Sequence, residues 1–410
     1  MTTDMSPMLS PRPEPLSIPN FMLKSRESLR FEEDDRGLEY VRYGFFGEIG
    51  GLLSAVKKSV RDNLDENVCE LAGEELGDAL WYLFITAHLL DVDPNELGHQ
   101  CLRVLREHFK DQNVAPDTII TFRHVDSLIE VHMTTEGIVR STYLGELAKS
   151  AGTLADMTYG ALQSLTIPRR AELLGKLMAW LALSCASFKL SLEEVARANI
   201  LKTASRWPKN YGIYPKHFDD DMPVHEQLPR KIKMDFIERE QGDYRYVVQR
   251  MSGVYIGDRL TDNSHEQDDY RFHDVFHLAY VAHLGWSPVL RGLMKRKRKS
   301  SPKIDENEDG ARAAIIEEGI ATWIFNHAKL RNHYADVSEG SLDYGLLKQI
   351  ASMVHGYEVS DCALWQWERA ILEGFSVFRQ LRDHRCGTIE VDMNVHTLKF
   401  LPLEENDDSE

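Results

Sequence analysis

A group of carboxylates interrupts an apolar helical pattern early in the chain. Glu74 and Glu75 lie four and three residues before Asp78, so on a helix all three project toward one side. Carboxylates that point into a helical bundle repel one another unless a cation neutralises them. Glu48, in the preceding helical segment, adds a fourth oxygen ligand. Hard oxygen ligands suit Mg²⁺ or Mn²⁺, usually held together with substrate phosphates; the alternative interpretation is a solvated acidic face.

The acidic segment lies in a stretch that recurs later in the chain. Residues 41–110 align with residues 139–208 without a gap at an offset of 98 residues, and a Gly-Glu and a Glu-x-Leu-Gly sequence occur in both. Each stretch has the apolar periodicity of three helices. The second stretch has Leu173 and Lys176 at two of the three acidic positions, so only the first stretch keeps the acidic cluster.

The two acidic motifs, F-G-E-I-G-G at residues 46–51 and E-E-L-G-D at residues 74–78, resemble those of the MazG-like, all-α nucleoside triphosphate pyrophosphohydrolases. That family has a helix with E-x-x-E followed by a helix with E-x-x-D, and the resemblance covers about residues 38–208. It implies a Mg²⁺-dependent enzyme that cleaves a (d)NTP between the α- and β-phosphates to a (d)NMP and pyrophosphate. One carboxylate, Glu75, would accept the proton of the attacking water. The implied metal ligands are Glu48, Glu74, Glu75 and Asp78.

The second stretch ends in a segment that resembles the phosphate- and base-contacting segment of the same family. Its motif is N-x-x-K…R-(aromatic)-P, carried here by Asn199, Lys202 and Arg206. MazG-like proteins bury their helix pairs in dimers, so the resemblance implies tandem copies that pair within the chain, the second copy being degenerate. One composite site would then take acids from the first copy and cationic groups from the second. Lys58 is a further candidate for phosphate contact; ordinary solvated side chains are the alternative for all these cations.

Gly51 departs from the family pattern, because it stands where the family usually has its second Glu. The change removes one metal ligand and favours an alternative function, a nucleotide-binding sensor that binds without turnover and controls the C-terminal domain. The intact set of Glu74, Glu75 and Asp78 favours the enzyme. The sequence identifies neither the base nor the sugar of the nucleotide.

A second group of side chains that suits a metal occurs in the C-terminal part. His273 and His277 lie four residues apart on an apolar helical pattern together with Asp274, and Glu317 and Glu318 lie on a second helical pattern. Histidines at this spacing, with carboxylates from another helix, are adequate ligands for Zn, Mn or Fe. A metal-dependent hydrolase centred on this cluster is therefore a further alternative function. A buried His/Glu hydrogen-bond network with only structural value is the competing interpretation.

The helices that would position these residues divide into three predicted units. The fold class is mainly α: tandem MazG-like helical repeats that form a pseudo-dimeric bundle, followed by a mainly helical C-terminal α+β domain with a small sheet. Alternating apolar and polar residues predict the strands, near residues 231–256 and 388–401. The predicted boundaries are a flexible N-terminal arm at 1–35, repeat 1 at 36–110, a connector at 111–136, repeat 2 at 137–208, the C-terminal domain at 209–403 and an acidic tail at 404–410.

The composition limits the binding partners and the cellular compartment that we expect for the protein. The chain has 410 residues, 43% of them hydrophobic, and a formal net charge of −17, which makes general nucleic-acid binding unfavourable. A basic run at residues 295–299 is followed by Asp305, Glu306, Glu308 and Asp309, which favours a solvated loop over a polyphosphate site. Five cysteines without Cys-x-x-Cys spacing fit reduced thiols in the cytoplasm. No apolar run reaches the ~18 residues of a membrane span, and the expected partners are a nucleoside triphosphate and a second copy of the chain in a homo-oligomer.

Overall fold

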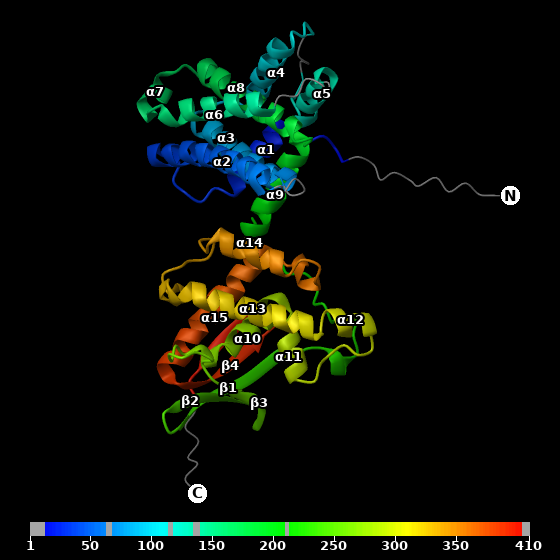
Figure 1. Cartoon of the computed structure of the whole chain (residues 1–410), viewed down its shortest axis with the longest axis vertical. Coiled ribbons are helices and arrows are strands. Elements are labelled where there is room, and N and C mark those ends of the chain that lie inside the picture. Colours follow the sequence, from blue (N-terminus) through cyan, green and yellow to red (C-terminus); the bar gives the residue numbers. More distant parts are fainter. Residues whose placement is uncertain (1–12, 63–67, 114–117, 134–139, 210–212, 404–410) are drawn as a thin grey trace, which may run out of the picture. The chain divides into compact units, whose positions relative to one another are not determined.

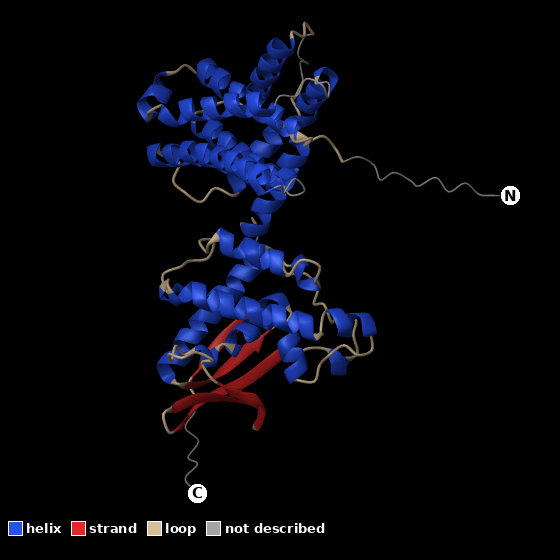
Figure 2. Cartoon of the chain, in the orientation of Figure 1, coloured by secondary structure: helices blue, strands red, loops and turns tan. Residues whose placement is uncertain are grey.

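The computed structural model of the protein describes residues 13–62, 68–113, 118–133, 140–209 and 213–403 (Figure 1). The chain divides into two compact units, Met1–Ala204 and Ser205–Glu410. Helices dominate both units, and the second unit also contains an antiparallel sheet (Figure 2). This confirms the predicted mainly α composition with a small sheet in the C-terminal part. The predicted acidic tail at 404–410 lies outside the described residues.

The first unit consists of helices around one continuous apolar core. Helix α4 shows how a helix of this unit begins: Asp93 accepts a hydrogen bond from the backbone of Glu96, and Pro94 follows at the first helical position. The side chains of Leu76, Leu83 and Leu174 are fully buried in the core. The helices are α1 (Ile18–Glu27), α2 (Asp35–Asp62), α3 (Val68–Leu89), α4 (Pro94–Phe109), α5 (Phe122–His132), α6 (Arg140–Asp156), α7 (Tyr159–Ser164), α8 (Ile167–Ser187) and α9 (Leu192–Arg206).

The predicted flexible arm at 1–35 is wrong for Ile18–Glu27, which forms helix α1. Ser17 caps this helix and a proline lies in its first turn, so the prolines that suggested mobility partly serve as a helix start. Phe21 is fully buried, and its ring lies 4.8 Å from that of Phe84 and 5.3 Å from that of Phe122. The beginning of the arm, residues 1–12, lies outside the described residues.

The predicted connector at 111–136 also contains a helix. Helix α5 begins after Thr121, whose side chain accepts a hydrogen bond from the backbone of His124. Its residues Phe122, Val125 and Ile129 are buried at helical spacing. The segment therefore packs on the core, although its β-branched residues favoured an irregular connection.

The length and apolar character of helices α8 and α9 test the expectation that no segment spans a membrane. Among the described residues, no single helix is long and apolar enough to do so. Helices α8 and α9 would meet that criterion together by length and composition, but they are bent by 100° relative to each other. In the first unit, the apolar residues of α8 are mostly buried in the core.

The second unit is built on a five-stranded antiparallel sheet in the order β3-β2-β1-β4-β5. Its strands are β1 (Lys231–Gln241), β2 (Tyr244–Met251), β3 (Val254–Leu260), β4 (Cys386–Asp392) and β5 (Thr397–Leu401). Its helices are α10 (Asp274–Leu284), α11 (Pro288–Leu293), α12 (Pro302–Asn307), α13 (Ala311–Lys329), α14 (Tyr344–Met353) and α15 (Leu364–His384), with short 3₁₀ turns at Val224–Glu226, Tyr270–Phe272, Asn332–Tyr334 and Glu358–Asp361.

One face of the sheet supports the helices (Figure 2). Alternate residues of β1 are buried, among them Ile232, Met234 and Phe236, as expected for a strand with one covered face. Helices α10 and α15 both contact β4 and β5 and pack on each other. Every residue of α10 is buried, so this helix is held firmly between the sheet and the other helices.

The basic run at 295–299 is only partly the solvated loop that its charges favoured: Lys295 and Lys299 are exposed, but Arg298 is not. Arg298 is fully buried and donates to both carboxylate oxygens of Asp309 and to Glu358. Arg291, also buried, donates to Asp219. A buried guanidinium needs such partners, and these arginines fix the loop to the body of the second unit.

Candidate functional sites

The carboxylates of Glu48 and Glu75 meet between helices α2 and α3 of the first unit, where they share a hydrogen bond. Gly51, one turn after Glu48 on α2, makes room for this contact. A Cβ atom at position 51 would lie 2.4 Å from Oε2 of Glu75. The Glu75 carboxylate therefore occupies the space in which a longer side chain at position 51 would begin. The glycine that removes a family ligand also lets Glu75 reach Glu48.

The environment of Glu48 is strongly unfavourable for its negative charge. Burial, then the charge of Asp78, then the hydrogen bond and charge of Glu75 raise the pKa of Glu48 to about 8. Lys202 opposes this shift. A carboxyl group with such a raised pKa shares a proton with its neighbours in the absence of a cation. A divalent cation would remove the cause of the shift, so the donor set fits a hard metal ion.

Two side chains of α9 bind the remaining carboxylates of the cluster. Nζ of Lys202 lies 2.5 Å from Oδ2 of Asp78 and 3.2 Å from Oε1 of Glu74. Nδ2 of Asn199 donates to Oδ1 of Asp78 at 3.0 Å. Acids of residues 41–110 and polar groups of residues 139–208 thus lie at one place, as predicted for a composite site.

The contacts between these helices follow the offset of 98 residues. A Cβ atom at Gly77 of α3 would lie 3.4 Å from Cβ of Asn199 on α9. At Gly175 of α8, 98 positions later, it would lie 2.4 Å from Cβ of Gln100 and 3.0 Å from the backbone nitrogen of Cys101, both on α4. Asn199 in turn is 98 positions after Cys101. The second helix of each stretch therefore faces the last helix of the other stretch at a glycine, closely for α8 and α4 and more loosely for α3 and α9.

A cleft of about 380 Å³ opens between α3 and α9 beside the cluster. Glu74, Asn199 and Lys202 are among the residues that line it. Oδ1 of Asn199 is buried and makes no hydrogen bond with any residue that the structure describes. A buried acceptor of this kind is costly unless a partner arrives, and a hydroxyl or amino group of a ligand in the cleft would satisfy it.

Three residues lie apart from this cluster. Arg206 falls in the second unit, where it donates to the carbonyl of Leu342 and stacks over the ring of Trp207. The prediction that Arg206 contacts the phosphates of a substrate has no support from this placement. Lys58 is exposed on α2. Glu172, the counterpart of Glu74, pairs with Arg103 and Arg169, and these arginines lower its pKa.

Tyr82 is a neighbour of the acidic cluster that sequence reasoning missed. Burial, then its hydrogen bond with Tyr40, then the charges of Glu48 and Asp78 raise the pKa of Tyr82, so its phenol stays protonated beside the carboxylates. The ring packs closely on α2, because a Cβ atom at Gly44 would lie 2.3 Å from it. A signal existed in the sequence: Gly44 and Gly51 lie seven residues apart, on one side of a helix.

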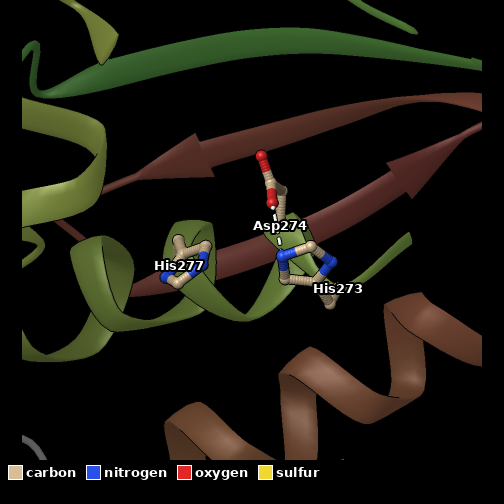
Figure 3. Close-up of side chains that lie close together, drawn as sticks. All are labelled: His273, Asp274 and His277. Carbon is tan, nitrogen blue, oxygen red and sulfur yellow. Dashed lines mark ion pairs between the residues drawn. The ribbon is translucent and has the colours of Figure 1, made fainter. Parts of the chain in front are cut away.

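In the second unit the structure brings His273, Asp274 and His277 together at the beginning of α10 (Figure 3). One ligand atom from each lies within 4.8 Å of the others. Nε2 of His273 is 3.1 Å from Oδ1 of Asp274. The other oxygen of that carboxylate accepts a hydrogen bond from Gln249 of β2 at 2.6 Å. The two predicted glutamates of α13, Glu317 and Glu318, lie at the same place.

The two glutamates differ in their surroundings. Glu317 is fully buried, and its carboxylate lies 2.7 Å from Nδ1 of His277, 2.6 Å from Oγ of Ser287 and 2.9 Å from the backbone nitrogen of Val289. Glu318 is 44% exposed and lies 3.5 Å from Nε2 of His277. Burial alone would lower the pKa of His277, but the charge of Glu317 and that of Glu318 outweigh burial and hold this pKa well above its usual value.

Sequence reasoning missed the groups that hold these ligands in place. Gln249 occupies an inward position of a strand, where an apolar side chain is the usual occupant. Tyr270 contributes its backbone carbonyl to Nδ1 of His273 at 2.9 Å, and its ring stacks on the imidazole at 4.2 Å. The position of Tyr270, three residues before His273, was the one available signal, since residues at that spacing share a helical face.

Comparison with known proteins gives a family for the second unit. Residues 213–404 match the family model of the MazG C-terminal domain. A stretch of 82 residues is 38% identical to the Gene 37 protein of Mycobacterium phage L5, which corresponds to 19% of this chain and 70% of that protein. No solved structure matches the chain. The family model thus covers the unit with the histidine cluster, whereas the motifs that resemble the pyrophosphohydrolases lie in the other unit.

Proposed function

This chain belongs to the MazG-like proteins, and we propose that its first unit is a nucleotide pyrophosphohydrolase that depends on Mg²⁺ or Mn²⁺. The substrate is a nucleoside triphosphate, cleaved to the monophosphate and pyrophosphate. The observation that carries the proposal is the meeting of four carboxylates from α2 and α3 with Asn199 and Lys202 of α9. This reaction needs carboxylates that hold a metal ion and also a positively charged side chain that faces the phosphates.

The carboxylates would hold the metal. Glu48, Glu75 and Asp78 lie close enough for burial and mutual repulsion to raise the pKa of Glu48 to about 8, and a bound cation relieves this repulsion. When bound, the metal would neutralise charge on the triphosphate and lower the pKa of a water molecule. The four carboxylates supply only oxygen atoms, the ligand type that Mg²⁺ prefers.

The other side chains of the site would position the nucleotide and move a proton. Glu75, which contacts Glu48, is the base in this proposal and accepts the proton of the attacking water. Lys202 lines the cleft and carries the positive charge that faces the phosphates. Asn199 offers its buried, unbonded oxygen to a hydroxyl or amino group of the nucleotide. All these groups come from α2, α3 and α9, and α2 packs along α3.

The two stretches related by the offset of 98 residues are tandem copies in this proposal. Their glycines, Gly77 and Gly175, both face the last helix of the other copy, and the approach is closer at Gly175. The second copy has Lys176 at the position of Asp78, and its Glu172 is engaged by two arginines. One active site per chain follows from this asymmetry.

The test is an assay of the full chain with a panel of NTPs and dNTPs and added Mg²⁺, in which monophosphate is resolved from diphosphate. We expect monophosphate and pyrophosphate, and a loss of activity of about 10²–10⁴-fold for Glu75→Gln, the range for removal of a general base. The matched control is Glu172→Gln, which should keep most of the activity. Equal losses in both variants, with both folded, would exclude a single site.

One observation favours a second candidate, a nucleotide sensor. Glu74 and Asp78 are already bound by Lys202, and Gly51 supplies no ligand, so the cluster has fewer acids free to hold a metal than the family pattern provides. A sensor would bind a nucleotide, measured by calorimetry, and release no pyrophosphate at any Mg²⁺ concentration. The same panel therefore decides between the enzyme and the sensor.

A further inference from the structure

We infer that the second unit holds a divalent transition metal on Nε2 of His273, Nε2 of His277 and carboxylate oxygens of Asp274 and Glu318. The ion belongs to the Zn²⁺, Mn²⁺ and Fe²⁺ class, since imidazole nitrogen with carboxylate oxygen is the ligand set that these metals share. This site lies in the unit that matches the MazG C-terminal domain and is independent of the pyrophosphohydrolase proposed for the first unit.

The first argument is that hydrogen bonds leave the correct nitrogen of each histidine for a metal. Nδ1 of His273 lies 2.9 Å from the carbonyl of Tyr270. A carbonyl only accepts hydrogen bonds, so Nδ1 carries the proton and the lone pair of Nε2 is available. Nδ1 of His277 donates in the same way to Glu317 at 2.7 Å. A partner on the second nitrogen is the usual arrangement of a histidine that binds a metal.

The second argument is that the carboxylates are oriented too. The Gln249 amide holds one oxygen of Asp274 and leaves the other, Oδ1, beside His273. Glu317 receives Ser287 Oγ, the backbone N–H of Val289 and His277, so it orients His277 rather than binding the metal. Glu318, its neighbour, projects to Nε2 of both histidines, at 3.5 and 3.7 Å.

The third argument concerns charge and burial. Three carboxylates surround two imidazoles, and His277 and Glu317 are both fully buried. Nε2 of His277 is buried and makes no hydrogen bond with a residue in the described part of the chain. A buried polar atom that makes no hydrogen bond is costly, and Glu318 gives it only a long ion-pair contact of 3.5 Å. A cation on Nε2 provides the missing partner and compensates the carboxylates.

The surrounding elements hold the site rigidly and expose it to solvent on one side. His273 and His277 lie at the start of α10, every residue of which is buried. Glu318 is the exposed member, at 44%, so the ion would meet water on that side. An open position is what distinguishes a reactive metal centre from a purely structural one.

The test uses the full chain, stripped with a chelator and titrated with Co²⁺ and Zn²⁺, and its metal content is measured by elemental analysis. The measurements are made in a Glu75→Gln background, so that the first unit contributes least. We expect about one transition-metal ion per chain and the visible absorption of Co²⁺ on nitrogen ligands. The double variant His273→Ala/His277→Ala should lose both. The matched control is His283→Gln, since His283 is equally buried on the same helix but pairs with Glu373.

Two further variants keep the proposal falsifiable if the double variant fails to fold. Glu318→Gln changes a half-exposed residue and should weaken metal binding while the circular dichroism spectrum is unchanged. Glu317→Gln should weaken it by about 10–100-fold, the effect of removing an orienting partner. Equal metal content in wild type and the histidine variant, or unchanged affinity in both glutamate variants, would overturn the proposal and leave a structural hydrogen-bond network.

Discussion

In the first unit, Glu74 and Asp78 bind a lysine from another helix, whereas in the second unit Glu317 binds a histidine, a serine and a backbone amide. Both arrangements place several carboxylates in one region. Only in the second unit is almost every proposed metal ligand held by a hydrogen bond with a residue that is not itself a ligand. The first site relies on side-chain contacts between α3 and α9 to bring opposite charges together. The second relies on hydrogen bonds behind each side chain.

This difference has a consequence for the kind of ion that each site suits. Mg²⁺ binds oxygen ligands and usually keeps several waters, so a site for it can be open and completed by substrate phosphates. The half-buried carboxylates beside the cleft of the first unit fit that description. A transition metal on histidine needs fixed tautomers and fixed ring orientations, which the contacts of Tyr270 and Glu317 provide.

The largest effect that separates the two sites is expected at Gly51. In Gly51→Ala the new Cβ would lie 2.4 Å from Oε2 of Glu75, so the carboxylate must move away from Glu48. A misplacement of about 1 Å at a catalytic group costs on the order of 10²-fold in kcat/KM. The measurement is the steady-state rate of pyrophosphate release, and the metal content of the second unit should not change.

The control for this variant is Gly50→Ala. Nothing lies within 4 Å of a Cβ at that position, while the gain in helix propensity, about 1 kcal/mol, is the same. Gly50→Ala should therefore be fully active and slightly more stable. Similar activities of the two variants would show that the contact of Glu48 with Glu75 has no role in catalysis.

A smaller effect is expected for Lys202→Met, which should strengthen the binding of Mg²⁺ and weaken the binding of the nucleotide. The lysine pairs with Glu74 and Asp78, so its removal takes a competing cation away from these carboxylates and should tighten Mg²⁺ binding. The nucleotide loses the positive charge that faces its phosphates, and KM should rise by roughly 10-fold. Lys176→Met, which changes the exposed counterpart of Asp78, is the matched control. A change of both affinities in the same direction would contradict the proposed role of Lys202.

The fold was largely predictable from apolar periodicity, and the exceptions have physical reasons. Helix α1 was missed because prolines dominate the segment before it, although Ser17 and the proline of the first turn are a start signal. Helix α5 was missed because β-branched residues lower helix propensity, whereas burial of Phe122 and Ile129 overrides it. Tertiary packing decided both cases.

The sequence predicted most of the residues that belong to each candidate site, but not what each of these residues contacts. Lys202 and Arg206 share one face of α9 by spacing, yet Arg206 belongs to the second unit, where it contacts Leu342. Periodicity shows which side chains share a face and not what that face meets. Glu317 and Glu318 are adjacent, so they project in different directions; only the packing of α13 determines that one is buried and the other exposed.

The smallest predicted effect is a pH dependence of stability from Glu48. The pKa of Glu48 is raised from 4.5 to about 8 in the folded protein, whereas the unfolded chain loses this proton near 4.5. Between these values the folded state binds the extra proton, so stability is fully present at low pH and falls as the pH rises through about 8. Glu48→Gln mimics the protonated group and should remove this slope.

The measurement is the melting temperature of wild type and Glu48→Gln between pH 6 and pH 9. Because Glu48 is only partly buried, solvent screening limits the effect to about 1 kcal/mol, or roughly 2–4 °C in a domain of this size. Mg²⁺ should restore the loss and so raise the melting temperature more at pH 8.5 than at pH 6, because it replaces the proton among the carboxylates. If the melting temperatures of the two proteins depend on pH in the same way, with and without Mg²⁺, then Glu48 is not coupled to a cation site. The first unit would then lack a carboxylate cluster that exchanges a proton for a cation, which is the property that sets it apart from the histidine cluster.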